Sequence, residues 1–457
     1  MQWSEAEKWS TDSFRSVSWA WPESLFCRLG DVLNRRDNEV VERHDLRTVP
    51  IIEKISFGGV ISVTDPDERE GYRGRLFWAE IGDLIYSKIR AKQGSLGLVP
   101  SKAGRIAVSA EYPVYAPIIS KVVPAYLILL LKCSAFLRFL DGLASGGDTK
   151  TRIAPDLFES LRIALPPLAT QQAIVAHWQA TQDKNAAAFK AADEHDVSTC
   201  RKFLEALGLS DHAQGITQRA FALQWSELER WSLGYIRQSS GNLAPDGGVY
   251  PMVRLGEVIA DLFNGWSPQC FDRPAEEHEW GVLKLGAVSF GSYNDRENKA
   301  LPPSLPPEPS LEIKVGDVLI SRANVPRLVG ACAHVTSTRA KLLLCDKIFR
   351  VILKEASPIT PEYIAEVMKL PHLRRQIESS VTGSSPTMQN ITKPALLALR
   401  IPLPPLAIQK QLVAEVTAAR ARIAAARAAA AQRAAATASE VEEMILGQRP
   451  APGMASP

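Results

Sequence analysis

The chain has 457 residues, 46% of them hydrophobic and 23% charged, with 53 basic and 50 acidic side chains. This length exceeds the usual limit of one hydrophobic core and predicts two or more domains, while the balanced charge neither demands nor excludes a nucleic-acid partner. Six scattered cysteines without a C-x-x-C pair provide no zinc spacing, so we expect no metal site. The polar first residues and the charges within the most apolar run, Tyr126–Leu140, argue against a signal peptide and a membrane span. We therefore expect a cytoplasmic protein without membrane association.

A tryptophan motif opens each half of the chain. "WSEAEKWS" begins at Trp3 and returns as "WSELERWS" at Trp225. The paired aromatic side chains, Trp3 with Trp9 and Trp225 with Trp231, are expected to pack against a core or a neighbouring domain rather than to stack on bases.

Two further segments recur downstream of this motif in the same order. "RLGDVL" at Arg28 matches "RLGEVI" at Arg254, and "IGDLIYSKIR" at Ile81 matches "VGDVLISRAN" at Val315. Between and after these segments, short β-branched runs alternate with Gly and Pro punctuation and with helical patterns such as Tyr126–Leu140 and residues 361–379. This mixture predicts an α+β globular unit in each half.

A proline-rich junction ends each globular part. "LRIALPPLATQQ" at Leu161 matches "LRIPLPPLAIQK" at Leu399, and over 20 residues more than half of the positions are identical. Four matches in one order predict a tandem duplication. The Pro-Pro pair should stop the preceding strand and direct the chain into a helix, because proline is tolerated at the mouth of a helix but not inside it.

Long helices are predicted after both junctions. From Ala169 to about Leu207, and from Ala407 to about Leu446, the chain contains neither proline nor an interior glycine. Such a helix would be about 60 Å long, and it would normally need a partner. Coiled-coil packing is indicated by an apolar stripe on each helix, although a solvated low-complexity helix is the alternative for "ARARIAAARAAAAQRAAATAS". The stripes comprise Ile174, Trp178, Phe189, Val197, Phe203, Leu204 and Leu207 on the first helix, and Leu412, Val416, Ala419, Ile423, Ala426, Ala430, Val441, Met444 and Ile445 on the second.

This order of segments, written twice, resembles the specificity subunit of type I restriction–modification systems. The junction at Leu399 is similar to that family's Pro-Leu-Pro-Pro-Leu motif with a following Gln, and the copy at Leu161 departs from it only by Ala164 in place of the first proline. "SVTGSSPTMQNITKPAL" at Ser380 and "ASGGDTKTRIAPDLF" at Ala144 resemble the loop before the junction, and "FNGWSPQ" resembles the opening of a recognition domain.

The resemblance implies an α+β fold with two tandem-repeated target recognition domains joined by two long helices packed as an antiparallel coiled coil. The expected segments are domain 1 (1–165), the first spacer helix and linker (166–224), domain 2 (225–398), the second spacer helix (399–446) and a disordered tail (447–457). Each domain would read one half of a bipartite double-stranded DNA target. The helices would dock two copies of a methyltransferase subunit, which would bind S-adenosylmethionine, and restriction or translocase subunits could join them.

Candidate DNA-binding side chains follow two matched strands and precede the two junctions. Base reading needs paired hydrogen-bonding groups, and phosphate binding needs positive charge. An ordinary basic surface loop, or a helix N-cap with turn residues, is the structural alternative at these places. The candidates are Lys88, Arg90, Lys92, Gln93, Thr149, Lys150 and Arg152 in the first half, and Arg322, Asn324, Arg327, Thr387, Gln389, Asn390 and Lys393 in the second.

Signatures of catalysis are missing from the sequence. It contains no Walker-type phosphate loop, no dinucleotide-binding G-x-G-x-x-G after a strand and no Asn/Asp-Pro-Pro-aromatic motif, while the triplet "EIK" at Glu312 is too common to indicate a nuclease. We therefore expect a non-catalytic subunit that binds no cofactor of its own. A coiled-coil protein–protein adaptor that never binds DNA is the alternative.

Overall fold

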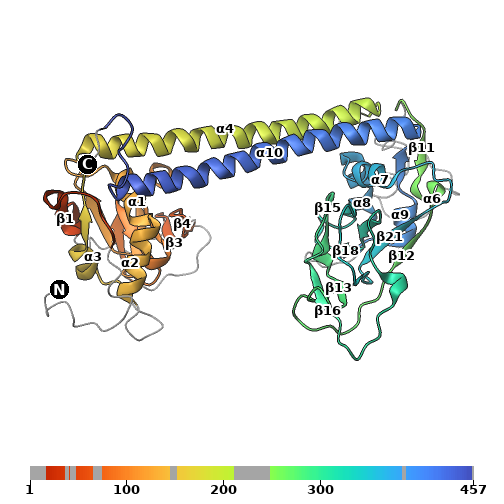
Figure 1. Cartoon of the computed structure of the whole chain (residues 1–457), viewed down its shortest axis with the longest axis horizontal. Coiled ribbons are helices and arrows are strands. Elements are labelled where there is room, and N and C mark those ends of the chain that lie inside the picture. Colours follow the sequence, from red (N-terminus) through yellow and green to blue (C-terminus); the bar gives the residue numbers. More distant parts are fainter. Residues whose placement is uncertain are drawn as a thin grey trace. The chain divides into compact units, whose positions relative to one another are not determined.

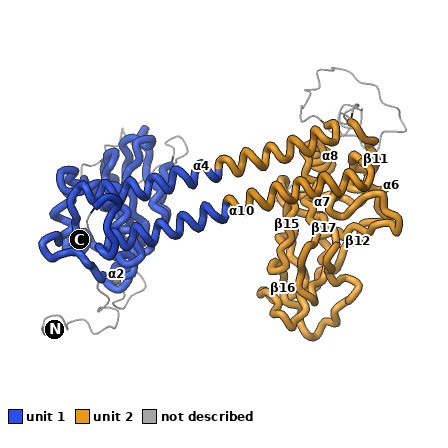
Figure 2. The backbone as a smooth tube through the Cα atoms, turned by 45° about the horizontal axis from the view of Figure 1, so that its top comes forward, with its two compact units in different colours: residues 1–189, 427–457 blue, residues 190–426 orange. Residues whose placement is uncertain are grey.

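The computed structural model describes residues 17–36, 41, 48–64, 75–144, 152–209, 248–382 and 388–454. The chain divides into two compact units (Figure 2): Met1–Phe189 with Arg427–Pro457, and Lys190–Ala426. Each of the two long helices therefore contributes one end to each unit. The repeated tryptophans Trp3, Trp9, Trp225 and Trp231 lie outside the described residues.

The first unit is built from two four-stranded sheets and a helical layer (Figure 1). The sheets have the strand orders β2-β9-β6-β7 and β4-β3-β8-β5, and a separate ribbon pairs β1 with β10. The largest core of this unit lies around α1, α2 and the β6 strand. The elements are β1 (Phe26–Arg28), β2 (Leu33–Arg35), β3 (Ile51–Ile55), β4 (Ile61–Thr64), β5 (Leu76–Ala79), β6 (Leu84–Tyr86), β7 (Leu96–Leu98), β8 (Ile106–Ser109), β9 (Val114–Pro117), α1 (Pro124–Lys132), α2 (Ser134–Ala144), α3 (Pro155–Ser160), β10 (Arg162–Ala164) and α4 (Leu168–Ala206).

The second unit has the four-stranded order β12-β21-β17-β19, a three-stranded sheet β16-β13-β20 and the ribbons β11-β23, β14-β15 and β18-β22. Its main core joins α7, α8 and the four-stranded sheet to α4 and α10. The elements are β11 (Met252–Arg254), α6 (Leu255–Val258), β12 (Ile259–Asn264), β13 (Gly281–Leu283), β14 (Val288–Ser289), β15 (Ser292–Tyr293), β16 (Asn298–Ala300), β17 (Val318–Ser321), β18 (Ala323–Asn324), β19 (Cys332–His334), β20 (Leu342–Leu343), β21 (Ile348–Leu353), α7 (Pro361–Val367), α8 (Pro371–Ser380), β22 (Gln389–Asn390), α9 (Lys393–Leu397), β23 (Arg400–Pro402) and α10 (Leu406–Ile445).

Each predicted helix of the globular parts is two shorter helices. Cys133 is extended (φ −62°, ψ 148°) and separates α1 from α2, while Leu370 is extended ahead of Pro371, the first residue of α8. Proline explains the second break, because it disfavours the α conformation of the residue before it. The first break has a tertiary cause: the Glu442 carboxylate accepts hydrogen bonds from the backbone N–H groups of Ser134 and Ala135.

The duplicated segments occupy the same place in both units. Cys27 pairs with Ile163 in the β1–β10 ribbon, and Val253 pairs with Ile401 in the β11–β23 ribbon. In the next step of each ribbon the N–H of Leu29 donates to Leu161, and the N–H of Leu255 donates to Leu399. The "RLG" and "LRI" motifs are therefore partners of one another, which is why both recur.

A buried glutamine ties each long helix to its own globular part. The Gln171 amide is fully buried; its Nε2 donates to the carbonyls of Pro166 (2.8 Å) and Lys121 (3.2 Å), and its Oε1 accepts from the N–H of Val123 (2.8 Å). The same three contacts therefore span the proline pair before α4 and the N-terminus of α1.

Gln409 repeats this arrangement in the second unit. Its Nε2 donates to Pro404 and Pro358, both at 2.8 Å, and its Oε1 accepts from the N–H of Thr360 at 2.9 Å. Like Gln171, Gln409 has no exposed surface.

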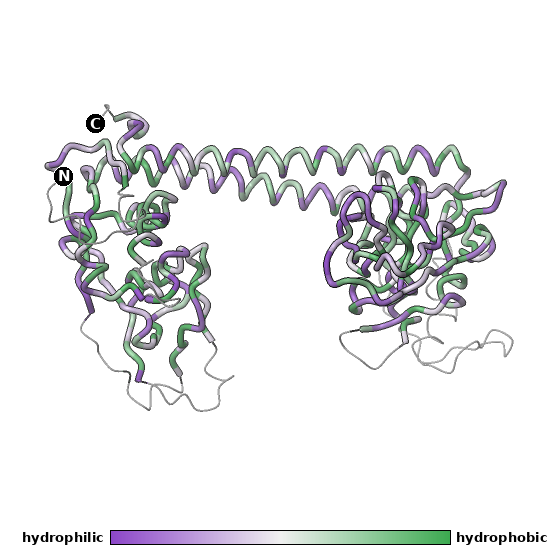
Figure 3. The backbone as a smooth tube through the Cα atoms, turned by 60° about the horizontal axis from the view of Figure 1, so that its bottom comes forward, coloured by the Kyte–Doolittle hydropathy of each residue, from purple (hydrophilic) through white to green (hydrophobic). Residues whose placement is uncertain are grey.

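The two long helices run antiparallel where they meet in the first unit. His177 contacts Glu440 (2.9 Å), and Asn185 contacts Arg433 (3.3 Å), so residue numbers rise along α4 as they fall along α10. Thr181 and Thr437 are joined at 3.3 Å between these two pairs. Figure 3 shows hydrophilic and hydrophobic residues mixed along both helices. The seam between α4 and α10, meaning the surface along which the two helices contact one another, is therefore partly polar in this unit.

In the second unit the two long helices share an apolar core. Phe203 and Leu204 of α4 belong to one buried cluster with Leu412 and Val416 of α10. The predicted pairing of the helices is confirmed, and the alanine-rich part of α10 is not solvated on every side, because Ile423 and Ala430 are buried.

Three members of the predicted stripes lie on the solvent side of the helices. Phe189 and Val197 are 43% and 60% exposed, and Ala426 is exposed. Asn185 and Ala192 are buried instead. The apolar pattern was misleading because the seam accepts polar residues that have partners on the facing helix.

The last described residues pack against the first unit. The N–H of Ala20 donates to Leu446, Trp21 Nε1 donates to Ile445, and Ala451 is 4% exposed in the core of this unit. The expectation of a disordered tail is thus wrong for residues 447–454, and residues 455–457 lie outside the described part. Within the described residues, no helix combines the length and the apolar character needed to cross a membrane.

We expect Gln171→Leu to lower the free energy of unfolding by about 2–4 kcal/mol, because it leaves one buried N–H and two carbonyls without partners. Urea unfolding followed by circular dichroism measures the change. Gln172→Leu is the matched control, since Gln172 is the exposed neighbour on the same helix turn. Equal stability of the two variants would contradict the role of the amide.

Candidate nucleic-acid interface

A buried aspartate shapes the turn before β6, the strand that the first group of candidate DNA-binding residues follows. Asp83, 2% exposed, accepts hydrogen bonds from Arg36 Nε (2.9 Å) and Nη2 (2.8 Å) and from the N–H of Glu80 (2.8 Å). Gly82 in this turn has φ +83°, a conformation that favours glycine. The ion pair therefore orients β6, the strand that Lys88 and Arg90 follow.

The matched turn of the second unit has the same construction. Asp317 accepts from the N–H of Lys314 (2.9 Å) and lies 3.1 Å from Arg350 Nε, and Gly316 has φ +97°. Sequence reasoning missed the role of both aspartates, although the repeated "GD" was the available signal.

The basic segments follow buried serines at the two strand ends. After Ser87, Lys88 is half-buried and Arg90 is exposed, and Gln93 is exposed at the end of a short 3-10 helix. After Ser321, the exposed Arg322 lies over the Phe349 ring with its guanidinium carbon 5.7 Å from the ring centroid.

One hydrogen bond in each unit joins the basic segment to the loop before the junction. The N–H of Ile153 donates to the carbonyl of Lys88, and the N–H of Ile391 donates to the carbonyl of Arg322, both at 2.9 Å. Tyr86 secures the first contact further, because its hydroxyl donates to the Ile153 carbonyl at 3.1 Å. Candidates that are far apart in the sequence thus come together at one place in each unit.

In the second unit the two candidate segments form a β-ribbon. Asn324 lies opposite Gln389, and Ala323 lies opposite Asn390. Asn324 is half-buried: its Oδ1 accepts from the N–H of Val325 at 2.9 Å, and its Nδ2 lies 3.4 Å from Ser321 Oγ. The ribbon presents amide side chains beside an exposed guanidinium.

Three candidate cations already have carboxylate partners. Lys92 lies 3.0 Å from Asp141, Arg152 lies 3.2 Å from Glu111, and Lys393 lies 2.6 Å from Asp261. The hydrogen bond from Lys393 is the main reason why the pKa of Asp261 is below its usual value. These cations are less available for phosphate than Arg90, Arg322 and Arg327, which are exposed.

The loop before the second junction also caps a helix. Thr392 is the N-cap of α9, and its side chain accepts from the N–H of Ala395 at 3.3 Å. A helix N-cap is therefore present in this loop, at a residue that is not one of the DNA-binding candidates. Thr149, Lys150 and Thr387 lie outside the described residues.

A basic, aromatic cleft adjoins Lys88 in the first unit. Arg35, Arg36, Trp78 and Tyr112 line it together with Lys88. Sequence reasoning missed the adjacent arginines, whose signal was the "RR" at positions 35 and 36. Arg36 is held by Asp83, and Arg35 lies 3.4 Å from Asp156 and 3.7 Å from Glu159, so Lys88 is the cation of this cleft best placed to approach a phosphate.

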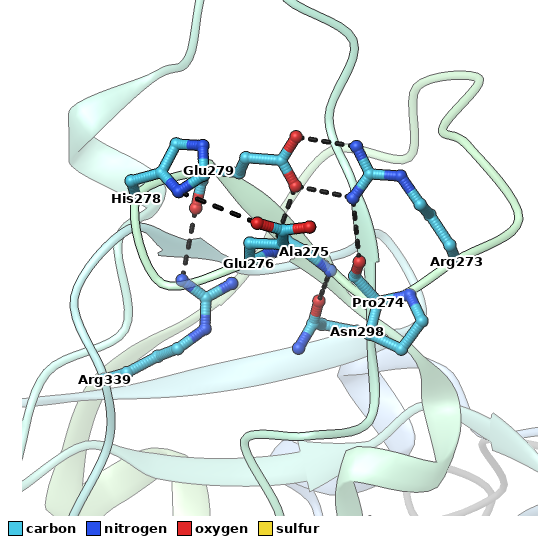
Figure 4. Close-up of polar contacts among 8 residues, drawn as sticks. All are labelled: Arg273, Pro274, Ala275, Glu276, His278, Glu279, Asn298 and Arg339. Carbon is cyan, nitrogen blue, oxygen red and sulfur yellow. Dashed lines mark hydrogen bonds and ion pairs between the residues drawn. The ribbon is translucent and has the colours of Figure 1, made fainter.

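A second arginine-rich surface is occupied by internal contacts (Figure 4). Arg273 makes two 2.6 Å hydrogen bonds to the Glu279 carboxylate, which also accepts from the N–H of Glu276 at 2.9 Å. The hydrogen bonds from Arg273 and then from Glu276 lower the pKa of Glu279 to about 2. Arg339 Nη1 donates to the Glu279 carbonyl at 3.1 Å. This network stabilises the segment before β13.

The "EIK" glutamate also has a backbone partner. Glu312 Oε1 accepts from the N–H of Lys341 at 2.6 Å, and Lys341 has φ +63°. Among the described residues, no group of three or more His, Cys, Asp or Glu side chains is placed to hold a metal ion.

The chain is similar in sequence to two known proteins. No protein-family model matches the chain. It is 37% identical over 164 residues to the type I restriction enzyme EcoEI specificity subunit of Escherichia coli, covering 36% of this chain and 27% of that protein. It is 23% identical over 291 residues to the EcoKI specificity subunit of Escherichia coli strain K12, covering 62% and 56%. The alignments thus span about a quarter and about half of these relatives.

A solved structure shares the fold. A chain from a study of complex assembly and conformational transition of the type I R-M system matches with a TM-score of 0.53 and 18% identity, over 92% of this chain and 96% of that chain. The predicted α+β fold with two domains and long helices is confirmed. The predicted resemblance is confirmed as well: the chain is similar to specificity subunits of type I restriction enzymes.

Proposed function

We propose that this chain is the non-catalytic DNA-recognition subunit of a type I restriction–modification complex. Each half reads one half of a bipartite double-stranded DNA target. The observation that carries the proposal is the matched hydrogen bond from Ile153 to Lys88 and from Ile391 to Arg322, which assembles a basic, polar surface at the same place in both units. The similarity to specificity subunits supports it.

The chemistry of the two surfaces suits DNA but differs between the halves. Lysine and arginine bind phosphates or guanine, and asparagine and glutamine pair with adenine. The first surface offers Lys88, Arg90 and Gln93, whereas the second offers Arg322 with the amides of β18 and β22. Two surfaces of similar shape and different side chains are what reading two different half-sites requires.

Methyl transfer is assigned to a partner. Two copies of a methyltransferase subunit that binds S-adenosylmethionine would dock on this chain, and restriction or translocase subunits could join them. We assign the two recognition domains to residues 1–165 and 225–398, with the spacer helices and their linker between and after them.

We expect the purified chain to transfer no methyl group. The same chain with its methyltransferase partner should methylate duplex DNA and lower its electrophoretic mobility. Tritiated S-adenosylmethionine incorporation and an electrophoretic mobility assay measure both outcomes. Methylation by the chain alone would contradict the non-catalytic assignment. A complex that forms with the partner but never shifts DNA would favour the coiled-coil adaptor.

Each surface should affect only its own half-site. We expect Arg90→Ala to relax sequence discrimination in one half of the target and Arg322→Ala to relax it in the other. Each variant should also release about one counterion fewer on binding DNA, as counted from the dependence of the binding constant on salt concentration. Arg422→Ala, which removes an exposed cation on α10, is the control and should leave both half-sites unchanged. Binding to randomised duplexes followed by sequencing measures the preference. A change in both half-sites from one substitution would count against two independent readers.

The helices should set the gap between the half-sites. Four helix-forming residues inserted after Ala424, with four more after Asp193 to preserve the antiparallel register, lengthen both helices by about 6 Å. With about 3.4 Å per base pair, the unread gap should grow by one or two pairs while both half-sites stay the same. Sequencing of methylated sites measures the gap, and an active variant with an unchanged gap would disprove the spacing role.

A further inference from the structure

The second unit contains a charged cavity that the proposed function does not use. Its volume is about 450 Å³, and it lies where α4 and α10 meet the helices α7 and α8. Pockets of this size hold small molecules. Its lining includes Phe203, Phe290, Lys369, Arg374, Val416 and Arg420.

The duplication shows why the cavity exists. The junction glutamines and the N-caps of α1 and α7 align the two halves, which places Trp178 at the position of Val416 and Leu137 at that of Arg374. In the first unit Trp178 and Leu137 pack against the core. The second unit has a smaller side chain and a cation at these two positions, so the equivalent space is open and charged.

The cavity lining holds four cations against three carboxylates, those of Asp196, Glu366 and Glu378, which leaves one excess positive charge. Glu366 accepts hydrogen bonds from both Lys369 (2.7 Å) and Arg420 (2.6 Å), so one carboxylate serves two cations. Arg374, whose side chain is 12% exposed, donates to the carbonyl of Val329 at 2.8 Å, and Glu378 lies 3.8 Å away.

Burial disfavours the charged forms of two of these cations. Desolvation is the largest influence on both Lys369 and Arg374, and it holds the pKa of each below its usual value despite the nearby carboxylates. A bound anion would offset that cost, because an opposite charge favours the protonated cations.

We propose that this cavity binds a small, free phosphate-bearing molecule, with Arg374 and Lys369 as its principal cationic contacts. Arginine suits this task because its planar guanidinium can donate two hydrogen bonds to one phosphate. Arg420 and the exposed Arg327 are further cations of the lining, and Arg327 is also one of the DNA-binding candidates. The site therefore adjoins the candidate DNA surface, but its principal contacts, Lys369 and Arg374, are not among the DNA-binding candidates. Since its walls come from α4, α10 and the helices of the second globular part, the ligand would strengthen the packing of the helix ends on this part.

Isothermal titration of the full chain with inorganic pyrophosphate as the probe tests the site. We expect saturable binding, weakened roughly ten-fold or more by Arg374→Leu, because a lost hydrogen bond to a charged group costs at least that much. Val416→Trp should abolish binding by filling the cavity as the first half does. Both variants introduce the residue found at the equivalent position of the first half, and circular dichroism checks their folding.

Arg322→Ala separates this site from the DNA surface. It should leave pyrophosphate binding unchanged, whereas Val416→Trp should leave DNA binding unchanged. Absence of pyrophosphate binding to the wild-type chain would overturn the proposal, as would equal binding by wild type and Arg374→Leu. Competition by duplex DNA would also overturn it, because the phosphate contact would then belong to the DNA interface. If Val416→Trp does not fold, Arg374→Leu decides the matter.

Discussion

A buried side-chain amide joins each long helix to the globular part that precedes it, and the geometry of each unit depends on that contact. Two adjacent prolines cannot donate hydrogen bonds, so they end the ribbon strand and leave carbonyls that need partners. Gln171 and Gln409 satisfy those carbonyls and at the same time accept the N–H of Val123 or Thr360 at the start of another helix. Because the amide is fully buried, any tilt of the helix would leave polar groups unpaired.

The same junction positions the candidate DNA surface. Only a short helix and a ribbon strand separate Ile153 or Ile391 from the following prolines. The hydrogen bonds of these isoleucines to Lys88 and Arg322 then place the basic strand ends at a defined point of each unit. A chain that repeats the junction therefore repeats the surface, while the side chains on that surface remain free to differ.

Sequence reasoning could predict what depends on local pattern or on repetition. The helices after "PPL" were predictable because about 40 residues lack proline and interior glycine, and the duplication indicated two similar units. It could not reveal that Lys393 is paired with Asp261, since the partner lies far away in the sequence. For the same reason it missed the Glu442 contact that breaks the predicted helix at Cys133, and the packing of Ala451. Polar seam residues such as Asn185 were missed because an apolar stripe cannot reveal a partner on the facing helix.

Hydrogen–deuterium exchange of the chain, free and bound to duplex DNA in the presence of its methyltransferase partner, tests the central claim most directly. In the proposed complex, DNA contacts the strand-end segments and the loops before the junctions in both units. We therefore expect slower exchange on DNA binding at residues 87–93 and 152–154 of the first unit, and at residues 321–327 and 388–391 of the second. Protection confined to one unit, or found only on the long helices, would contradict the presence of two equivalent reading surfaces.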